Sequence, residues 1–182
     1  MRIIAGKYGG RVFRAPKGLE TRPTASRARE ALFSILGDLE DKVVVDCYAG
    51  SGALGLEALS RGARLVVFIE KSPLALKAIN ANLSVLGAND AVRVLACGVL
   101  QAGPTLKTLA PLDWVLADPP WAIAQQALQE VAEVTRGLLA PGAGVVVGHR
   151  AKHPIEPAAD GPLRLLQRRH WGDSGVSFFA AS

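Results

Sequence analysis

Hydrophobic positions from residue 42 onward follow two alternating patterns. Short uninterrupted apolar runs are typical of buried parallel strands, and longer segments with apolar residues at helical spacing are typical of helices. We expect strands at residues 43–47, 65–69, 92–95, 112–117 and 144–148, and helices at 53–60, 73–86 and 123–139. This alternation predicts an α/β fold with a mostly parallel sheet, right-handed crossovers and helices on both faces.

The two ends of the chain depart from this pattern. Residues 2–5 and 11–14 form short apolar and basic runs around two glycines, which predicts a β-hairpin, and the spacing over 26–36 predicts a helix. Near the other end, two strands at 163–170 and 176–180 are expected to form a hairpin, so that one of them is antiparallel to the rest. The sequence therefore predicts an N-terminal extension over residues 1–40 and an α/β domain over residues 41–182.

Length and apolar content fit one domain, since 182 residues with 49% hydrophobic side chains are enough for a sizeable core. No apolar stretch approaches the length of a membrane-spanning helix, and the first residues lack the apolar segment of a signal peptide. We expect a cytoplasmic protein. Cys47 and Cys97 lie in or beside apolar runs, which favours buried thiols over a disulfide or metal pair.

Positive charge is concentrated near the start of the chain. Eight basic residues precede residue 30, against one acidic residue, Glu20. The basic residues are Arg2, Lys7, Arg11, Arg14, Lys17, Arg22, Arg27 and Arg29. A second group follows near the end, formed by Arg164, Arg168, Arg169 and His170. This asymmetry favours a polyanionic partner such as a nucleic acid, although a solvated basic face would give the same pattern.

The turn after the first predicted strand carries a nucleotide-binding pattern, G-x-G-x-x-G, at Gly50, Gly52 and Gly55. Glu70 ends the second strand, where a carboxylate can accept hydrogen bonds from ribose hydroxyls. Asp46 lies four residues before the first glycine. Its charge suits the cationic amino-acid end of S-adenosylmethionine and would repel the pyrophosphate of NAD; the alternative is that Asp46 only caps the turn.

The fourth predicted strand ends in Asp118-Pro119-Pro120-Trp121, at the edge of the sheet where α/β proteins bind ligands. The two prolines stiffen the turn and remove backbone donors, which leaves the Asp118 carboxylate and the Pro119 carbonyl as acceptors. Acceptors that bind both N–H groups of a nucleobase amine can direct its lone pair towards a methyl donor. Trp121 offers a face on which the base can stack.

With these residues in place, the chain resembles the bacterial small-subunit ribosomal RNA guanine-N2 methyltransferases of the RsmD type over nearly its whole length. The motifs that carry this resemblance are Met1 to Gly6 with Gly10-Arg11, Thr21-Arg22-Pro23-Thr24, Arg29 to Phe33, Ala49 to Gly55, Glu57 to Ala63, Glu70-Lys71 and Asp118-Pro119-Pro120. The last motif alone would also fit DNA adenine methylases.

The resemblance implies a class I methyltransferase fold, S-adenosylmethionine as the donor, and one guanine of 16S RNA in an assembling 30S subunit as the acceptor. We expect a monomer without a metal site. The residues expected to bind the cofactor are Asp46, Tyr48, Ala49, Gly50, Ser51, Gly52, Glu70, Lys71 and Asp118, and those expected to bind RNA are Arg2, Lys7, Arg11, Arg22, Thr24 and Arg27.

Two departures from the family pattern qualify this expectation. Relatives usually carry an aspartate after the third strand, whereas residues 95–99 hold no carboxylate here, so either backbone groups bind the adenine or the cofactor binds more weakly. Relatives more often have tyrosine or phenylalanine where this chain has Trp121, which preserves stacking. Other hypotheses are a DNA adenine methylase, a non-catalytic RNA-binding assembly factor on the same fold, and a small NAD-dependent dehydrogenase.

Overall fold

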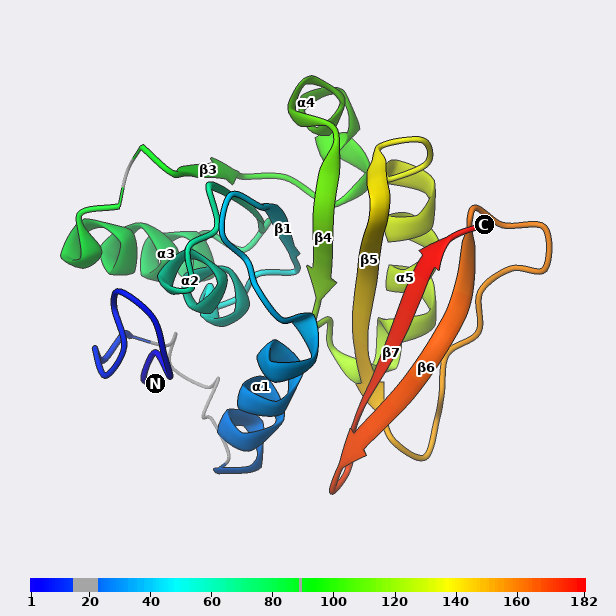
Figure 1. Cartoon of the computed structure of the whole chain (residues 1–182), viewed down its shortest axis with the longest axis horizontal. Coiled ribbons are helices and arrows are strands. Elements are labelled where there is room, and N and C mark those ends of the chain that lie inside the picture. Colours follow the sequence, from blue (N-terminus) through cyan, green and yellow to red (C-terminus); the bar gives the residue numbers. More distant parts are fainter. Residues whose placement is uncertain (15–22, 89) are drawn as a thin grey trace.

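A single sheet of seven strands organises the computed structural model, which describes residues 1–14, 23–88 and 90–182 and side chains of the first helix from Ser26 onward (Figure 1). The strands are β1 (Val43–Cys47), β2 (Leu65–Ile69), β3 (Val92–Leu95), β4 (Leu112–Ala117), β5 (Leu139–Arg150), β6 (Leu163–Trp171) and β7 (Ser174–Ala181). The helices are α1 (Pro23–Leu36), α2 (Ala53–Ser60), α3 (Pro73–Leu86), α4 (Gly103–Leu109) and α5 (Ala124–Val134), with 3-10 turns η1 (Leu100–Ala102) and η2 (Trp121–Ile123).

The strand order is β3-β2-β1-β4-β5-β7-β6. Strands β1 to β5 pair in parallel, while β7 lies antiparallel between β5 and β6. The expected sheet, mostly parallel with one antiparallel C-terminal strand, is confirmed. Since the order reverses between β1 and β4, the carboxyl ends of these two strands form the switch point where ligands of α/β proteins bind.

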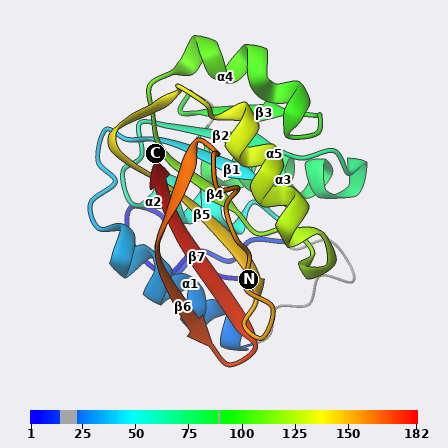
Figure 2. The same cartoon turned by 90° about the vertical axis from the view of Figure 1, so that its right-hand side faces the viewer.

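Helices cover both faces of the sheet, as the continuous apolar strands require. Alternate residues of the central strands divide between two cores: Val44 and Val66 face the side of α1, α2 and α3, and Val45 and Val67 face α4 and α5. Figure 2 shows α1 and α5 on opposite sides of β5 and β7. In the part of the chain that the structure describes, no helix is both long and apolar enough to cross a membrane.

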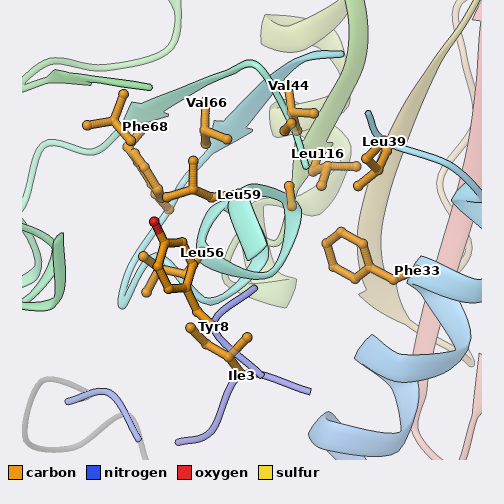
Figure 3. Packing of buried hydrophobic residues seen from close by; sticks show 14 of the residues in the cluster. Ile3, Tyr8, Phe33, Leu39, Val44, Leu56, Leu59, Val66, Phe68 and Leu116 are labelled. Atoms are coloured by element: carbon orange, nitrogen blue, oxygen red, sulfur yellow. The ribbon is translucent and has the colours of Figure 1, made fainter. Parts of the chain in front are cut away.

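The N-terminal segment, residues 1–14, packs against α2 and α3. It folds back on itself with one antiparallel bridge between Arg2 and Val12, so the expected hairpin is present only as this short pairing. Ile3 and Tyr8 are buried beside Leu56 of α2 (Figure 3). The carboxylate of Glu57, fully buried on α2, accepts hydrogen bonds from the backbone N–H groups of Ile4 (2.7 Å) and Ala5 (3.2 Å) and therefore holds the segment in place.

Several expected boundaries were wrong. Helix α1 begins at Pro23 rather than at residue 26, in keeping with the preference of proline for the first helical turn. Helix α5 ends at Val134 rather than 139, and β5 extends over Leu139–Arg150 rather than 144–148, because Leu139 pairs with Leu112 of β4. Helix α4 was not expected, because its first two residues, Gly103 and Pro104, form a dipeptide typical of turns. Proline is nevertheless tolerated in the first turn of a helix.

Candidate active site

The turn between β1 and α2 has the backbone conformation that its glycines suggested. Gly50 and Gly52 adopt positive φ angles of 55° and 78°, and Gly52 precedes the first residue of α2. A Cβ atom on Gly55 would collide with the ring of Phe68, so this glycine lets α2 pack closely on β2. Tyr48 also has a positive φ, 55°, which is unusual for a residue with a side chain.

Glu70 connects the ends of β1 and β2. One carboxylate oxygen, Oε2, accepts a hydrogen bond from the N–H of Gly50 (2.8 Å). The other, Oε1, accepts from the N–H groups of Lys71 and Ser72 at 2.8 Å each. Because Oε2 accepts only one of these bonds, it retains a lone pair for a hydroxyl group above the turn. The Lys71 side chain is exposed, and its contribution here is this backbone N–H.

Asp46 lies buried under the same turn, with 1% of its surface exposed. Its Oδ2 accepts a hydrogen bond from the N–H of Gly55 at 2.8 Å, so it does cap the start of α2. Burial raises the pKa of Asp46 well above its ordinary value; the bond from Gly55 opposes this, and the negative charges of Asp118 and Glu70 add to it. A cationic group bound beside these carboxyl groups would favour the ionised form of Asp46 and be stabilised by it in turn.

The side chains of Tyr48, Ala49 and Ser51, also expected at the cofactor site, contact other parts of the protein or are buried. The Tyr48 hydroxyl donates a hydrogen bond to Oε2 of Glu130 on α5 (2.8 Å), which supports a packing role for this side chain. Ala49 and Ser51 are buried, and the Ser51 hydroxyl lies 3.3 Å from Sδ of Met1. Cys47 is buried in β1, as expected, whereas Cys97 after β3 is only half-buried; both are free thiols.

Asp118 and the two prolines follow β4 directly, beside the neighbouring strand β5. A Cβ atom on Gly148 of β5 would lie 2.5 Å from Oδ1 of Asp118, so this glycine makes room for the carboxylate. The carboxylate is open to a hollow, yet protein surrounds it on the other sides, and this desolvation raises the pKa of Asp118. Trp121 begins η2 with 40% of its surface exposed, and the Arg150 guanidinium carbon lies 6.0 Å from its ring centroid.

The hollow beside Asp118 is partly open to solvent, and the empty space in it and at its mouth amounts to about 580 Å³. Its walls come from α1, α2, η2 and the adjoining ends of β4, β5 and β7, and they include Arg29, Leu32, Asp118, Trp121, His149 and Ser174. The sequence had singled out Asp118 and Trp121 but neither Arg29 nor the β7 side as parts of one site. The available signal was in α1, where Ala28 and Leu32 lie at helical spacing next to a basic residue.

His149 is a buried structural residue of this wall. Its Nε2 lies 2.9 Å from Oγ of Ser177, and its Nδ1 lies 3.0 Å from the carbonyl oxygen of Arg150. Both ring nitrogens therefore have protein partners. Among the described residues, no group of three or more His, Cys, Asp or Glu side chains is placed to hold a metal ion.

The residues expected to bind RNA lie largely on the N-terminal side of the molecule. Arg2, Lys7, Arg11 and Arg27 are exposed. The charged ends of Lys7 and Arg11 lie 5.4 and 5.5 Å from the ring centroid of Tyr8, which is itself buried. Arg22 lies outside the described residues, and the side chain of Thr24 is likewise outside them.

Comparison with known proteins finds similarity over nearly the whole length of this chain. A family model described as Conserved hypothetical protein 95 matches residues 1–180. Ribosomal RNA small subunit methyltransferase D of Escherichia coli (strain K12) is 34% identical, over 96% of this chain and 93% of that protein. A solved structure from Escherichia coli, of the protein yhhF, provisionally named a methyltransferase, is 31% identical with a TM-score of 0.79, covering 100% of this chain and 98% of its own. A hypothetical protein of Thermus thermophilus has a TM-score of 0.80 at 27% identity, covering 98% of both chains.

Proposed function

Given that this chain belongs to the Conserved hypothetical protein 95 family, together with ribosomal RNA small subunit methyltransferase D, we propose that it methylates the exocyclic N2 of a guanine in 16S ribosomal RNA, with S-adenosylmethionine as the donor. The observation that carries the proposal is the position of Asp118. Its carboxylate lies at the switch point of the sheet, close enough to Asp46 of the glycine turn to influence its pKa, and it also lines the hollow. Donor and acceptor would therefore meet at this side chain.

The residues of the β1–α2 turn fit the proposed cofactor. When bound, S-adenosylmethionine supplies an electrophilic methyl group on a positively charged sulfur. Gly50 and Gly52 let a ligand approach the backbone closely, and Oε2 of Glu70 retains a lone pair for a ribose hydroxyl. The Asp46 carboxylate would stabilise the cationic end of such a ligand, with a smaller contribution from the charge of Asp118 nearby.

The Asp118 motif fits an amine acceptor. A base amine is a poor nucleophile because its lone pair is delocalised into the ring. The Asp118 carboxylate and the Pro119 carbonyl would each accept one N–H of the amine, which orients the lone pair and favours the pyramidal geometry of the transition state. Trp121, exposed at the rim of the hollow, would stack on a base that has left its helix.

The basic N-terminal segment is proposed to bind the RNA backbone, through Arg2, Lys7, Arg11 and Arg27 and through Arg22 and Thr24. We further propose that the substrate is an assembling 30S subunit, that the enzyme acts as a monomer, and that it works in the cytoplasm. Similarity to the Escherichia coli protein named ribosomal RNA small subunit methyltransferase D supports the ribosomal RNA substrate.

Methyl transfer from labelled S-adenosylmethionine tests the proposal. Undermethylated 30S subunits, free 16S RNA and DNA are offered separately, and the product is digested and separated into nucleosides. Label in N2-methylguanosine from 16S RNA is the expected result, and it should disappear in Asp118→Ala. Label in N6-methyladenine of DNA would replace the proposal by an adenine methylase. Cofactor binding without label in any substrate would favour the non-catalytic assembly factor.

A further inference from the structure

Arg29 of α1 is a buried arginine, and most of its N–H donors have no partner among the residues that the structure describes. Only 7% of its surface is exposed. The single hydrogen bond of its guanidinium within the described residues runs from Nη2 to the carbonyl oxygen of Arg2, at 2.7 Å. Its Nε is buried without a hydrogen-bond partner among residues 1–14, 23–88 and 90–182. A guanidinium carries five N–H donors, and buried donors in native proteins are nearly always satisfied, so this arrangement calls for an additional acceptor.

Within the described residues, 1–14, 23–88 and 90–182, no carboxylate supplies that acceptor. None of the ion pairs in the described part of the chain includes Arg29. Glu57 is near enough to raise its pKa, but burial outweighs this effect and lowers the pKa overall. The Glu57 carboxylate is already engaged by the N–H groups of Ile4 and Ala5 and by Nε of Arg61 at 2.8 Å. Leaving such a cation partly unpaired is costly unless a ligand completes its hydrogen bonds.

The hollow that Arg29 lines is the one that contains Asp118 and Trp121. An occupant that contacts both Asp118 and Arg29 would have to offer an amine to the acceptors at Asp118 and an acceptor to the free donors of Arg29. Adenine, cytosine and guanine all carry exocyclic amines. In guanine the acceptors O6 and N7 lie side by side on the major-groove edge, away from the N2 amine. In adenine the N7 acceptor lies beside the amine itself, and in cytosine the acceptors N3 and O2 share the Watson–Crick edge with the amine.

Resting on the proposed function, we propose that Arg29 is the specificity-determining residue of this site and donates hydrogen bonds to the O6 and N7 edge of the target guanine while its N2 amine meets Asp118. Arginine is the side chain that most often contacts this edge of guanine. The bond from Nη2 to Arg2 and the nearby Phe13 ring, 5.9 Å from the guanidinium carbon, would hold the group in position. The motif Asp118-Pro119-Pro120 would then supply the chemistry, and Arg29 the choice of base.

The base is a better partner for Arg29 than an RNA phosphate. A base that leaves its helix enters the hollow, whereas its phosphates stay at the rim. The arginines at the surface on this side, Arg2 and Arg27, are exposed and suit phosphates, while Arg29 lies in the wall. This difference in burial separates backbone binding from base recognition.

Replacement of O6 in the substrate tests the assignment. Reconstituted 30S subunits carry either guanine or 2,6-diaminopurine at the nucleotide mapped by methyl transfer; the analogue keeps the N2 amine but has a donor in place of O6. The wild-type enzyme should prefer guanine by about 10- to 100-fold in kcat/KM. Arg29→Met, which removes the donors without leaving a buried polar group, should lower kcat/KM for guanine and reduce the preference to less than about threefold, and Arg29→Lys should be intermediate.

Arg27→Gln is the matched control on the same helix. As an exposed residue proposed to bind RNA, it should lower kcat/KM for both substrates equally and leave the preference unchanged. If Arg29→Met lowered kcat/KM equally for both substrates, the assignment would be overturned. Arg29 would then keep only its structural role, the hydrogen bond to Arg2. If Arg29→Met does not fold, equal use of both bases by the wild type, or an unchanged preference in Arg29→Lys, would overturn it. Methylation of a base other than guanine would refute the proposed function itself, whereas methylated guanine without Arg29-dependent preference refutes only this inference.

Discussion

Asp118 combines the two properties that the proposed chemistry needs: it is open to the hollow and partly desolvated by its surroundings. Desolvation strengthens a hydrogen bond from an amine to a carboxylate because less water competes for it. The same desolvation favours the protonated acid. A single side chain therefore links the strength of substrate orientation to the pH at which the enzyme works.

Asp118→Asn should reduce kcat by about 10²–10³-fold, comparable with the loss of one preorganised hydrogen-bonding group elsewhere, while S-adenosylmethionine affinity changes by less than about threefold. Steady-state methyl transfer and calorimetric titration measure the two quantities. Near-normal turnover would refute the role of Asp118.

The pH dependence of Asp118 has a definite sign. Because its pKa is raised, the active carboxylate is lost at a higher pH than for an exposed aspartate. The wild-type kcat/KM should fall as pH decreases through this raised pKa, with a tenfold loss per pH unit on the acid side. This acid limb should be absent from the residual activity of Asp118→Asn, and its persistence there would assign it to another group.

Asp46 gives a test that separates capping from cofactor binding. Its pKa is raised in the folded state, so the protein loses stability as pH rises from the unfolded-state pKa to this raised pKa; the cost is complete above the raised pKa and disappears only below the unfolded-state pKa. Asp46→Asn keeps an acceptor for the Gly55 N–H and removes the charge. It should therefore raise the melting temperature at pH 8 relative to wild type, with a smaller difference at acidic pH.

If Asp46 also binds the cationic end of the cofactor, Asp46→Asn should weaken S-adenosylmethionine binding at least about tenfold, the effect expected from losing a hydrogen bond to a charged group. Thermal unfolding and calorimetric titration on the same samples give both results. An unchanged cofactor affinity would leave Asp46 with the capping role alone.

At the scale of elements, the close pairing of β4 and β5 positions the catalytic side chain. Gly148→Ala would bring a methyl group to 2.5 Å from Oδ1 of Asp118, so the carboxylate must shift. We expect kcat to fall about 10- to 100-fold, because small displacements of a positioned group are costly, with little change in cofactor affinity. Gly103→Ala is the matched control: its new methyl group lies 3.3 Å from Val134, away from the site, and turnover should be retained. Normal turnover of Gly148→Ala would show that the carboxylate tolerates displacement.

At the scale of the whole molecule, charge is distributed to suit a polyanion. The net charge is +5, and exposed arginines lie in the N-terminal segment and in α1, the helix that contributes one wall of the hollow. RNA affinity should therefore decrease with salt, because binding releases counterions. Arg22→Glu should weaken RNA binding about tenfold and lower the slope of log Kd against log salt by about 0.7, as for one single-stranded phosphate. Filter binding over a salt series measures this, and an equal loss of cofactor affinity would contradict an RNA role for Arg22.

The sequence alone determined the parts of this protein that depend on neighbouring residues. The five parallel strands and the turn from Asp46 to Gly55 followed from apolar runs and glycine spacing, since both patterns lie within a few consecutive residues. The Asp118 motif was found in the same way, because its position after a strand already places it at the edge of the sheet. How the residues after β3 bind the adenine of the cofactor without a carboxylate stays a prediction.

Only the tertiary structure decided how distant segments come together. Residues of α1 line one hollow with residues of β5 and β7 that lie more than 100 positions further along the chain. The burial of Arg29 there is set by packing rather than by its neighbours in sequence. The N-terminal segment likewise appeared as a basic arm, yet Glu57 and the apolar side chains of Ile3 and Tyr8 fix it against α2. The sequence does not show whether a charged side chain will face solvent, face a partner or line the wall of a pocket. Burial depends on which surfaces meet when the chain folds.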